Sequence, residues 1–205
     1  LFSTGEFRSR YLAQDLNSQM GKIIKINILD FGKQIFSMGH RNIQGLYLDE
    51  INKFVISTEH GPKGGDEINI ISDLERNDEN IPNYGWPLSS YGEHYPSSDP
   101  ENKYIFKKSH REYDFIEPIK FYTPSIGISE IVAIDSTKKL YLHGSLKYKS
   151  LYLIKLNGKN QISNFTSIHM NDRIRDVLKF DNKIFLYLEN EGSIAIIDME
   201  KFKNV

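Results

Sequence analysis

Residues 127–158 read GISEIVAIDSTKKLYLHGSLKYKSLYLIKLNG, and this stretch decides the fold. Its three runs rich in Ile, Val, Leu and Tyr are separated by short polar or Gly-containing turns, which is typical of consecutive strands. The same order of strand, polar turn, strand, Gly-containing loop and strand is found in residues 42–72 and in residues 173–200. The sequence therefore contains an internal repeat.

The spacing of the repeat predicts a β-propeller. Ile131 and Val177 hold equivalent positions in the last two units, and they are separated by about the 40 to 50 residues that one four-stranded blade requires. A polar, Pro-containing insert between Ser72 and Lys120 separates the first two units. We therefore expect an all-β fold.

We expect residues 1–205 to form one partial β-propeller domain of roughly three blades. Few segments follow a helical period, and residues 11–21 and 72–80 can each supply only a helical turn or two. Because propellers close with four or more blades, the remaining blades should lie upstream. The first residues show neither an initiator Met nor a signal-peptide pattern, so we expect either a removed leader or the carboxy-terminal portion of a longer protein.

The composition restricts any function to local sites. The chain carries 26 Lys and Arg against 27 Asp and Glu, which gives no overall field suited to nucleic acid or an anionic membrane. Cysteine is absent, which excludes disulfides, thiol catalysis and thiolate metal sites. No apolar run is long enough to span a membrane.

The loop in TEHGPKGGDEINII, residues 58–71, is long, flexible and charged for a connection between two strands. Its three glycines allow backbone conformations in which carbonyl groups turn toward a cation. The carbonyls of Gly61 and Pro62 and the carboxylates of Asp66 and Glu67 are hard oxygen ligands of the kind that Ca²⁺ takes. Gly-rich acidic turns are common, and most of them bind nothing.

Basic residues recur at equivalent places in the repeat. In a propeller, residues just before the innermost strand and residues after the second strand gather at one mouth of the central channel. Arg41 and Asn42 precede one inner strand, Arg173 and Arg175 flank another, and Lys147 follows a second strand. The alternation of side chains along an extended segment places the last two arginines on one side, where two guanidinium groups suit a polycarboxylate.

Simpler structural explanations exist for these residues. Arg41 alone would be interpreted as part of a surface ion pair of small value. The arginine pair at 173 and 175 can form a surface network with Asp172 and Asp176. His60 can be a hydrogen-bonded turn residue. The coincidence across three repeats favours a ligand site.

Six motifs occur in a fixed order along the chain. They are GHRNIQGL from residue 39, EHGPKGGDEINII from residue 59, NYGWP from residue 83, YTPSIGIS from residue 122, GSLK from residue 144 and RIRDV from residue 173. In this order they resemble the soluble pyrroloquinoline quinone (PQQ)-dependent sugar dehydrogenases, the group of glucose/sorbosone and aldose sugar dehydrogenases. AQDLNSQMGKIIKIN, from residue 13, matches the segment just upstream. The resemblance covers nearly the whole chain.

The resemblance implies a six-bladed propeller with PQQ at the channel mouth and a Ca²⁺ ion that bridges protein and quinone. It implies oxidation of an aldose at its anomeric carbon by hydride transfer to the quinone, with a small sugar as substrate and an external electron acceptor. Quinoproteins of this group work in the periplasm or are secreted. Exposed sheet edges would leave room for a homodimer.

By motif, the residues expected to bind the cofactor are Arg41, Asn42, His60, Asp66, Lys147, Arg173 and Arg175. Arg41 is expected to act in catalysis by stabilising the negative charge that develops on the quinone oxygen, while the lysine and the arginine pair would meet the quinone's carboxylates. The expected metal ligands are the carbonyls of Gly61 and Pro62 for the cofactor calcium, and Glu67 with the backbone of Tyr84 for a second, structural calcium.

The general-base histidine of the group lies in an earlier blade, so no histidine of this chain inherits that role. The same resemblance extends to hedgehog-interacting proteins, whose propeller binds a ligand or protein without redox chemistry. A calcium-dependent lactonase-like propeller is a further alternative. The four cations favour the enzyme, because they suit a tricarboxylate such as the quinone.

Overall fold

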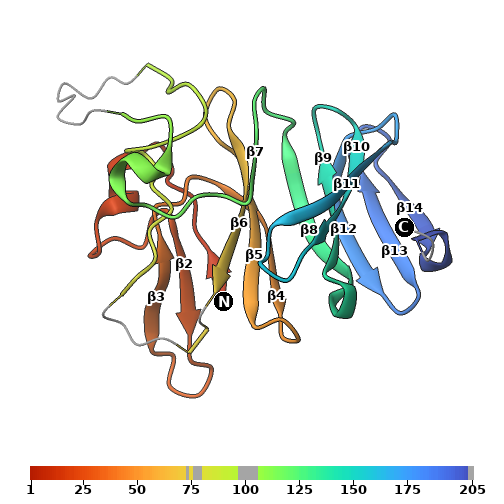
Figure 1. Ribbon diagram of the computed structural model, residues 1–205, viewed down its shortest axis with the longest axis horizontal. Coiled ribbons are helices and arrows are strands. Elements are labelled where there is room, and N and C mark those ends of the chain that lie inside the picture. Colours follow the sequence, from red (N-terminus) through yellow and green to blue (C-terminus); the bar gives the residue numbers. More distant parts are fainter. Residues whose placement is uncertain (73, 76–79, 97–105, 203–205) are drawn as a thin grey trace.

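The repeat units fold into separate antiparallel sheets. The computed structural model describes residues 1–72, 74–75, 80–96 and 106–202. In this part of the chain, four sheets of three, four, four and three strands follow one another in chain order (Figure 1). Within each sheet, every strand pairs with the next one in the sequence. This is the strand order of propeller blades, and it confirms the expected all-β propeller.

The strands have the following bounds. The first sheet contains β1 (Phe2–Ser3), β2 (Lys22–Ile26) and β3 (Lys33–Met38), and the second contains β4 (Ile43–Asp49), β5 (Phe54–Glu59), β6 (Asp66–Ser72) and β7 (Lys120–Tyr122). The third contains β8 (Ile128–Asp135), β9 (Leu140–Ser145), β10 (Ser150–Leu156) and β11 (Ile162–His169), and the fourth contains β12 (Ile174–Phe180), β13 (Lys183–Leu188) and β14 (Ser193–Asp198). Short 3₁₀ turns form η1 (Arg10–Gln14), η2 (His110–Tyr113), η3 (Ser136–Lys138) and η4 (Met199–Phe202).

Three of these sheets correspond to the three repeat units expected from the sequence. The additional sheet, β1 to β3, is formed by residues upstream of the first unit. The pattern of the sequence does not predict the outer strand β11, because nearly all of its residues are solvent-exposed and none of its faces is apolar. Of the two expected helical turns, the one in residues 11–21 is present as η1, and the one in residues 72–80 lies largely outside the described residues.

Neighbouring sheets are joined by a contact that repeats. The Thr58 hydroxyl of β5 donates to the main-chain O of Ser129 in β8 at 2.7 Å. The Ser129 hydroxyl in turn donates to the main-chain O of Ile174 in β12 at 2.6 Å. Gly45 of β4 packs so closely on β8 that a Cβ there would lie 2.6 Å from the main-chain N of Ile131. These contacts hold the inner strands β4, β8 and β12 side by side.

Apolar clusters fill the space between the sheets. The cluster between the second and third sheets includes the fully buried side chains of Ile56, Ile68, Ile131, Tyr141 and Ile154. The cluster between the third and fourth sheets includes Leu142, Leu151, Ile174, Ile184 and Leu186. The facing sides of neighbouring sheets are therefore buried, and the stability of the array comes from these interfaces. The outer face of the fourth sheet is exposed, including Leu178, Phe180 and Ile194.

The insert between β6 and β7 folds over the end of the first sheet. The main-chain N of Met38 donates to Pro82 O at 3.0 Å, and the N–H of Tyr84 donates back to Met38 O at 2.9 Å. The N–H of Trp86 donates to Gly39 O at 2.9 Å. These bonds place the NYGWP motif directly beside the start of β4.

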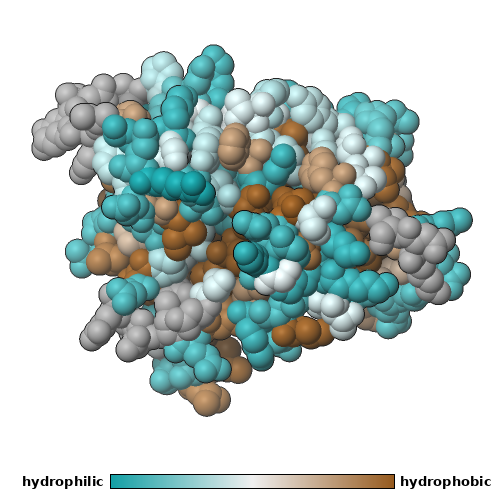
Figure 2. Space-filling view, viewed as in Figure 1, coloured by the Kyte–Doolittle hydropathy of each residue, from teal (hydrophilic) through white to brown (hydrophobic). Residues whose placement is uncertain are grey.

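Figure 2 shows hydrophilic residues over much of the drawn face, with hydrophobic residues near its centre and along its lower edge. Among the described residues, no helix has the length and apolar character needed to cross a membrane.

Candidate functional site

Arg41 lies at the mouth where the inner strands begin, immediately before β4. Its main-chain N–H donates to Glu59 Oε2 at 2.8 Å, and its Nη1 donates to the main-chain O of His60 at 3.0 Å. The guanidinium carbon lies 5.4 Å from the centroid of the Trp86 ring, within the range of a cation–π contact. Both the backbone and the side chain are held, so Arg41 presents a preorganised cation.

His60 links the Gly-rich loop to the next blade. Its ring Nε2 donates to the main-chain O of Ile128 at 2.7 Å. Burial is the main cause that lowers the pKa of the His60 ring, and the carboxylate of Asp66 opposes it. The positive charges of Arg41 and Arg175 lower this pKa further. The ring is therefore neutral at pH 7 and serves as a hydrogen-bond donor to the neighbouring strand.

Asp66 holds the same two blades together. Its Oδ1 accepts from the N–H of Gly61 at 3.2 Å, and its Oδ2 accepts from the N–H groups of Gly127 at 2.7 Å and Ile128 at 3.0 Å. The side chain is fully buried, and both carboxylate oxygens are engaged by backbone amides. Asp66 thus organises the mouth of the channel through the backbone.

The Gly-rich loop offers main-chain oxygens. Among the described residues, no donor is bonded to the carbonyl oxygens of Gly61 or Pro62. The loop curls so tightly that a Cβ at Gly61 would lie 2.1 Å from Gly65 O and 2.4 Å from Gly64 O. Main-chain oxygens without a hydrogen-bond donor are among the ligands that a calcium ion takes.

Arg173 and Arg175 share one carboxylate at the start of the fourth sheet. Arg173 Nε donates to Glu189 Oε2 at 2.6 Å, and Arg175 Nη2 donates to Glu189 Oε1 at 2.8 Å. The alternative partners named from the sequence are wrong, because Asp172 and Asp176 accept from main-chain amides instead. Both guanidinium groups are more than a third exposed and retain unused N–H donors.

Two further expected residues lie at the edge of this mouth. The Asn42 side chain is exposed, and its main-chain O accepts from the N–H of His60 at 2.9 Å. Lys147 is also exposed, and its N–H donates to Ile126 O at 2.9 Å. The ammonium of Lys147 lies over the Tyr148 ring at 5.8 Å. The backbone of Lys147 is thus bonded to Ile126, and the next two residues, Gly127 and Ile128, donate to Asp66.

Glu67 is paired with a histidine from the insert. His110 Nε2 lies 3.0 Å from Glu67 Oε1, and its Nδ1 lies 2.5 Å from Ser89 Oγ. The histidine packs so tightly against the NYGWP segment that a Cβ at Gly85 would lie 2.3 Å from His110 Nδ1. His110 therefore fills the space between the Glu67 carboxylate and the backbone beside Tyr84.

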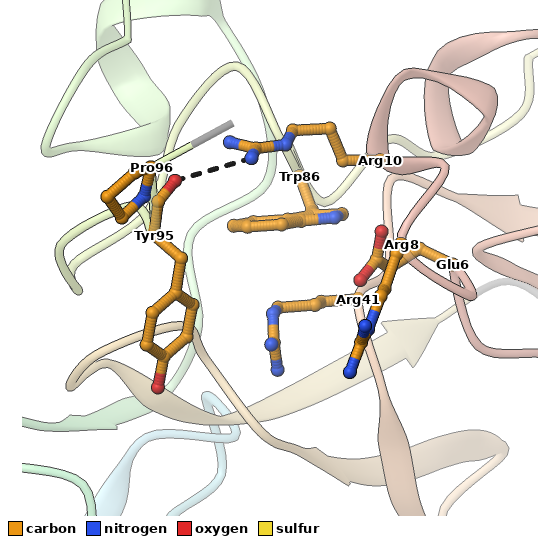
Figure 3. A pocket seen from close by; sticks show the side chains of 7 residues that line it. All are labelled: Glu6, Arg8, Arg10, Arg41, Trp86, Tyr95 and Pro96. Atoms are coloured by element: carbon orange, nitrogen blue, oxygen red, sulfur yellow. Dashed lines mark hydrogen bonds between the residues drawn. The ribbon is translucent and has the colours of Figure 1, made fainter. Parts of the chain in front are cut away.

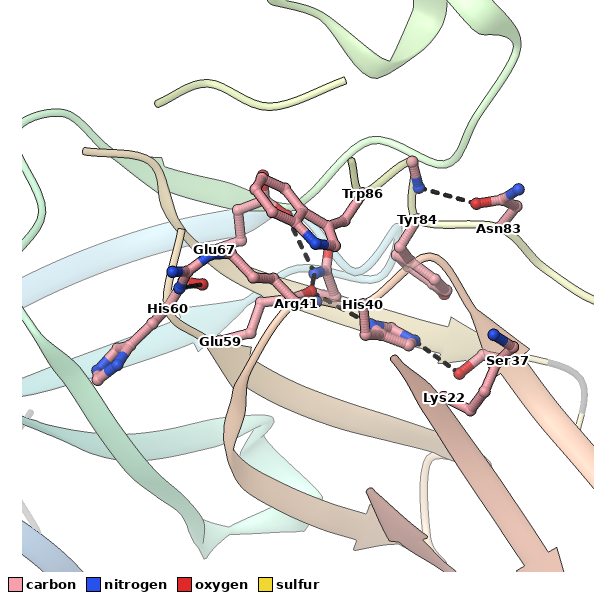
Figure 4. A network of polar contacts seen from close by, with 12 residues as sticks. Lys22, Ser37, His40, Arg41, Glu59, His60, Glu67, Asn83, Tyr84 and Trp86 are labelled. Atoms are coloured by element: carbon pink, nitrogen blue, oxygen red, sulfur yellow. Dashed lines mark hydrogen bonds and ion pairs between the residues drawn. The ribbon is translucent and has the colours of Figure 1, made fainter. Parts of the chain in front are cut away.

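A buried polar network continues from this pair to Arg41 (Figure 4). Asn69 Nδ2 donates to Glu67 Oε2 at 3.4 Å and to Glu59 Oε1 at 2.7 Å. His40 Nδ1 lies 3.2 Å from Glu59 Oε1, and its Nε2 lies 2.8 Å from Ser37 Oγ. Burial acts to raise the pKa of Glu59, but the imidazole and backbone N–H bonds outweigh it and lower that pKa.

Sequence reasoning missed both histidines of this network. His40 is part of the GHRN motif, and its position next to Arg41 in the sequence could have identified it as a site residue. No local pattern points to His110, which lies 43 residues after its partner Glu67.

Comparison with known proteins agrees with this fold. Residues 1–197 match the family model of Glucose / Sorbosone dehydrogenase. The chain is 32% identical over 211 residues to the uncharacterized protein slr1608 of Synechocystis, covering 93% of this chain and 48% of the relative. It is 28% identical over 213 residues to the aldose sugar dehydrogenase YliI of Escherichia coli, covering 92% of this chain and 53% of the relative.

Solved structures show the same architecture. A crystal structure of a glucose dehydrogenase matches with a TM-score of 0.75 at 27% identity, over 95% of this chain and 59% of that one. The PQQ-bound aldose sugar dehydrogenase of Streptomyces coelicolor matches with a TM-score of 0.66 at 23% identity, over 94% of this chain and 55% of that one.

The fold is thus that of the β-propeller sugar dehydrogenases. This chain belongs to the glucose/sorbosone dehydrogenase family, which confirms the resemblance of its motifs. It spans about half the length of the curated relatives that it matches.

Proposed function

We propose that this chain supplies the cofactor site of a quinoprotein that oxidises an aldose at its anomeric carbon, with PQQ bound through Ca²⁺. The observation that carries the proposal is the fixed position of Arg41 between Glu59, the His60 carbonyl and the Trp86 ring, beside a loop with open carbonyls. The names of the relatives support it, since one is an aldose sugar dehydrogenase and another is solved with PQQ bound.

The residues present fit a quinone that carries several carboxylates. Arg173 and Arg175 retain free donors beyond their bonds to Glu189, and Lys147 is exposed. Guanidinium groups with free N–H pairs bind carboxylates in a bidentate manner. We assign these three cations to the quinone's carboxylates and Arg41 to the oxygen that gains negative charge, with Asn42 at the same edge.

Of the two expected calcium sites, the side chains and carbonyls of this chain suit one. The open carbonyls of Gly61 and Pro62 suit the cofactor calcium. The second ion does not fit, because the carboxylate of Glu67 already faces His110, and the imidazole occupies the space toward Tyr84. We therefore propose a single calcium for this chain.

The proposal gives each residue of the candidate site a physical role. When bound, the quinone supplies the acceptor for the hydride that leaves the anomeric carbon. Arg41 stabilises the developing negative charge, and it does so without reorganisation because Glu59 and Trp86 hold it in place. His60 keeps its ring bonded to Ile128 and orders the loop. The base that takes the hydroxyl proton comes from outside this chain, as the resemblance implies.

The remaining parts of the proposal rest on the family. The electrons pass from the quinone to an external acceptor, and the protein works in the periplasm or outside the cell. A homodimer through exposed sheet edges stays a prediction.

The test is PQQ binding and aldose oxidation by the full natural protein that carries this chain. PQQ should bind in the presence of Ca²⁺ and be released by a chelator, and glucose should be oxidised with an artificial electron acceptor. Arg41→Gln should lower kcat by on the order of a hundredfold, as removal of a charge-stabilising donor does. Arg111→Gln, at a side chain that is 83% exposed, is the matched control. A protein that binds no PQQ at any Ca²⁺ concentration would instead be a binding propeller.

A further inference from the structure

A cavity of about 540 Å³ opens beside Arg41, on the same side as the Trp86 ring (Figure 3). Its volume suits a small molecule such as a sugar. The residues that line it are Glu6, Arg8, Arg10, Arg41, Trp86, Tyr95 and Pro96. Arg41 also borders the narrow pocket around the Gly-rich loop, so a ligand in this cavity lies next to the candidate cofactor site.

The cavity is strongly cationic. Three guanidinium groups face one carboxylate, and among the described residues neither Arg8 nor Arg10 has an ion pair. To the described residues, the Arg10 side chain makes long hydrogen bonds, at 3.4 Å to His94 Nδ1 and 3.3 Å to the main-chain O of Tyr95. The cofactor proposal gives neither Arg8 nor Arg10 a role.

The excess of positive charge in the cavity affects the pKa of the neighbouring His94. Burial lowers the pKa of His94 to about 4, and the nearby Arg10, Lys108 and Arg41 contribute to the lowering. His94 is therefore neutral at pH 7, stacked on Trp86 with ring centroids 5.0 Å apart. His94 therefore adds no positive charge to the cavity, where three guanidinium groups still face one carboxylate.

Several polar atoms of the lining residues lack partners. Glu6 Oε2, Arg41 Nε and Trp86 Nε1 are buried without a hydrogen bond to any described residue. Buried polar atoms are nearly always bonded in folded proteins, so three around one cavity indicate a place that a polar ligand completes. A sugar offers hydroxyl groups that both donate and accept, which matches one acceptor and two donors.

The position of the arginines is built into the fold. The main-chain N–H of Glu6 donates to Arg41 O at 3.0 Å, which anchors the amino-terminal segment at the site. Arg8 and Arg41 extend in the same direction in Figure 3, with the Glu6 carboxylate near both, and Arg10 lies across the Trp86 ring. One end of the cavity is thus shared with the candidate reaction centre, and the additional cations lie beside it.

We propose that this cavity is the substrate subsite and that it selects an anionic aldose, a sugar that carries a carboxylate or a phosphate. The sugar hydroxyls meet Glu6, Arg41 and Trp86, and the anionic group is bound by Arg8 and Arg10. This inference rests on the proposed function. The chemistry at the anomeric carbon is the same as for a neutral aldose.

The test compares glucose, glucuronate and glucose 6-phosphate as substrates of the full natural protein loaded with PQQ and Ca²⁺. We expect kcat/KM for at least one anionic sugar to exceed that for glucose by about tenfold or more. The anionic group accepts a charge-assisted hydrogen bond from an arginine, which glucose cannot form. The two anions distinguish a carboxylate from a phosphate ligand. In Arg8→Gln and Arg10→Gln, the ratio of anionic sugar to glucose should fall about tenfold, whereas Arg10→Lys should retain part of it.

Calorimetry on the cofactor-free protein gives a readout that does not depend on turnover. Glucuronate or glucose 6-phosphate should bind the wild type, and binding should weaken in Arg8→Gln and Arg10→Gln but not in Arg111→Gln. Three results overturn the inference: a preference for glucose that both variants leave unchanged, a loss of PQQ affinity in the variants, which would assign these arginines to the cofactor, or no calorimetric binding of either anion. Failure of the proposed function is different, since PQQ would then not bind the wild type at all.

Discussion

The carboxylate of Asp66 accepts a hydrogen bond from the main-chain N–H of Gly127 at 2.7 Å, and this bond joins two neighbouring blades at the candidate site. Its second carboxylate oxygen accepts from Gly61, the first residue of the open carbonyl pair. One buried side chain therefore sets the position of the Gly-rich loop relative to the next inner strand.

Asp66→Asn should destabilise the fold by roughly 2 to 3 kcal/mol, because the amide keeps one acceptor oxygen and turns an NH₂ group toward backbone donors. Urea unfolding measures the change. The control is Asp198→Asn, at an exposed carboxylate, which should have almost no effect. An equal, small effect of both substitutions would show that the bonds of Asp66 contribute little.

Arg173→Gln and Arg175→Gln should each weaken PQQ binding by about 1.5 to 3 kcal/mol, the value of a charge-assisted hydrogen bond. Unfolding of the cofactor-free protein should change little, because the ion pairs with Glu189 are partly exposed and worth at most about 1 kcal/mol. Titration with PQQ and thermal unfolding measure the two effects. If both variants unfold early and bind PQQ normally, the arginines serve the fold alone.

The sequence was sufficient to select the residues of the candidate site but not to pair them. Arg41 lies directly before β4 and donates to the main-chain O of His60 at the start of the Gly-rich loop, so the two meet where β4 begins and β5 ends. That order of strand and loop is visible in the sequence as apolar runs separated by polar or Gly-containing segments. The same logic failed for β11, whose exposed residues carry no apolar alternation.

Partners across the fold had no local signal. The carboxylate shared by Arg173 and Arg175 is Glu189, which directly follows the paired strand β13, and not the adjacent aspartates. His110 reaches Glu67 from a long insert whose path depends on packing against the first sheet. Such contacts are set by tertiary structure, which periodicity and spacing do not encode.

The second expected calcium gives a prediction of stoichiometry. Because His110 fills the space beside Glu67, we expect one bound Ca²⁺ per chain in the full natural protein with PQQ, measured by mass spectrometry of the metal after dialysis. Two tightly bound ions per chain would contradict this assignment.

Removal of the His110 side chain tests the contact between His110 and Glu67 through its effect on stability. His110→Ala should cost about 3 kcal/mol, since it leaves the buried Glu67 carboxylate with only the long hydrogen bond from Asn69 among the described residues. Millimolar Ca²⁺ should then restore part of the loss in the variant and leave the wild type unchanged. His169→Ala, at an exposed histidine, is the control for loss of an imidazole.

His143 predicts how stability depends on pH. The ring is completely buried, stacks on Tyr152 with centroids 5.0 Å apart, and has its Nε2 at 3.0 Å from the Tyr122 hydroxyl. Burial lowers the pKa of His143 to about 4, although a bond to the main-chain O of Gly144 opposes the shift. In the unfolded chain the pKa of histidine is about 6.5.

A histidine with a depressed pKa in the folded state binds protons more readily when unfolded. Its contribution is therefore fully present above about pH 6.5 and is lost as the pH falls from there toward 4, by up to roughly 3 kcal/mol. Urea unfolding between pH 7.5 and 4.5 should show this loss in the wild type and a smaller one in His143→Gln, which cannot take up the proton. His169→Gln, at an exposed histidine, is the control. An identical slope in the wild type and His143→Gln would mean that His143 takes up its proton in the folded chain as readily as in the unfolded chain.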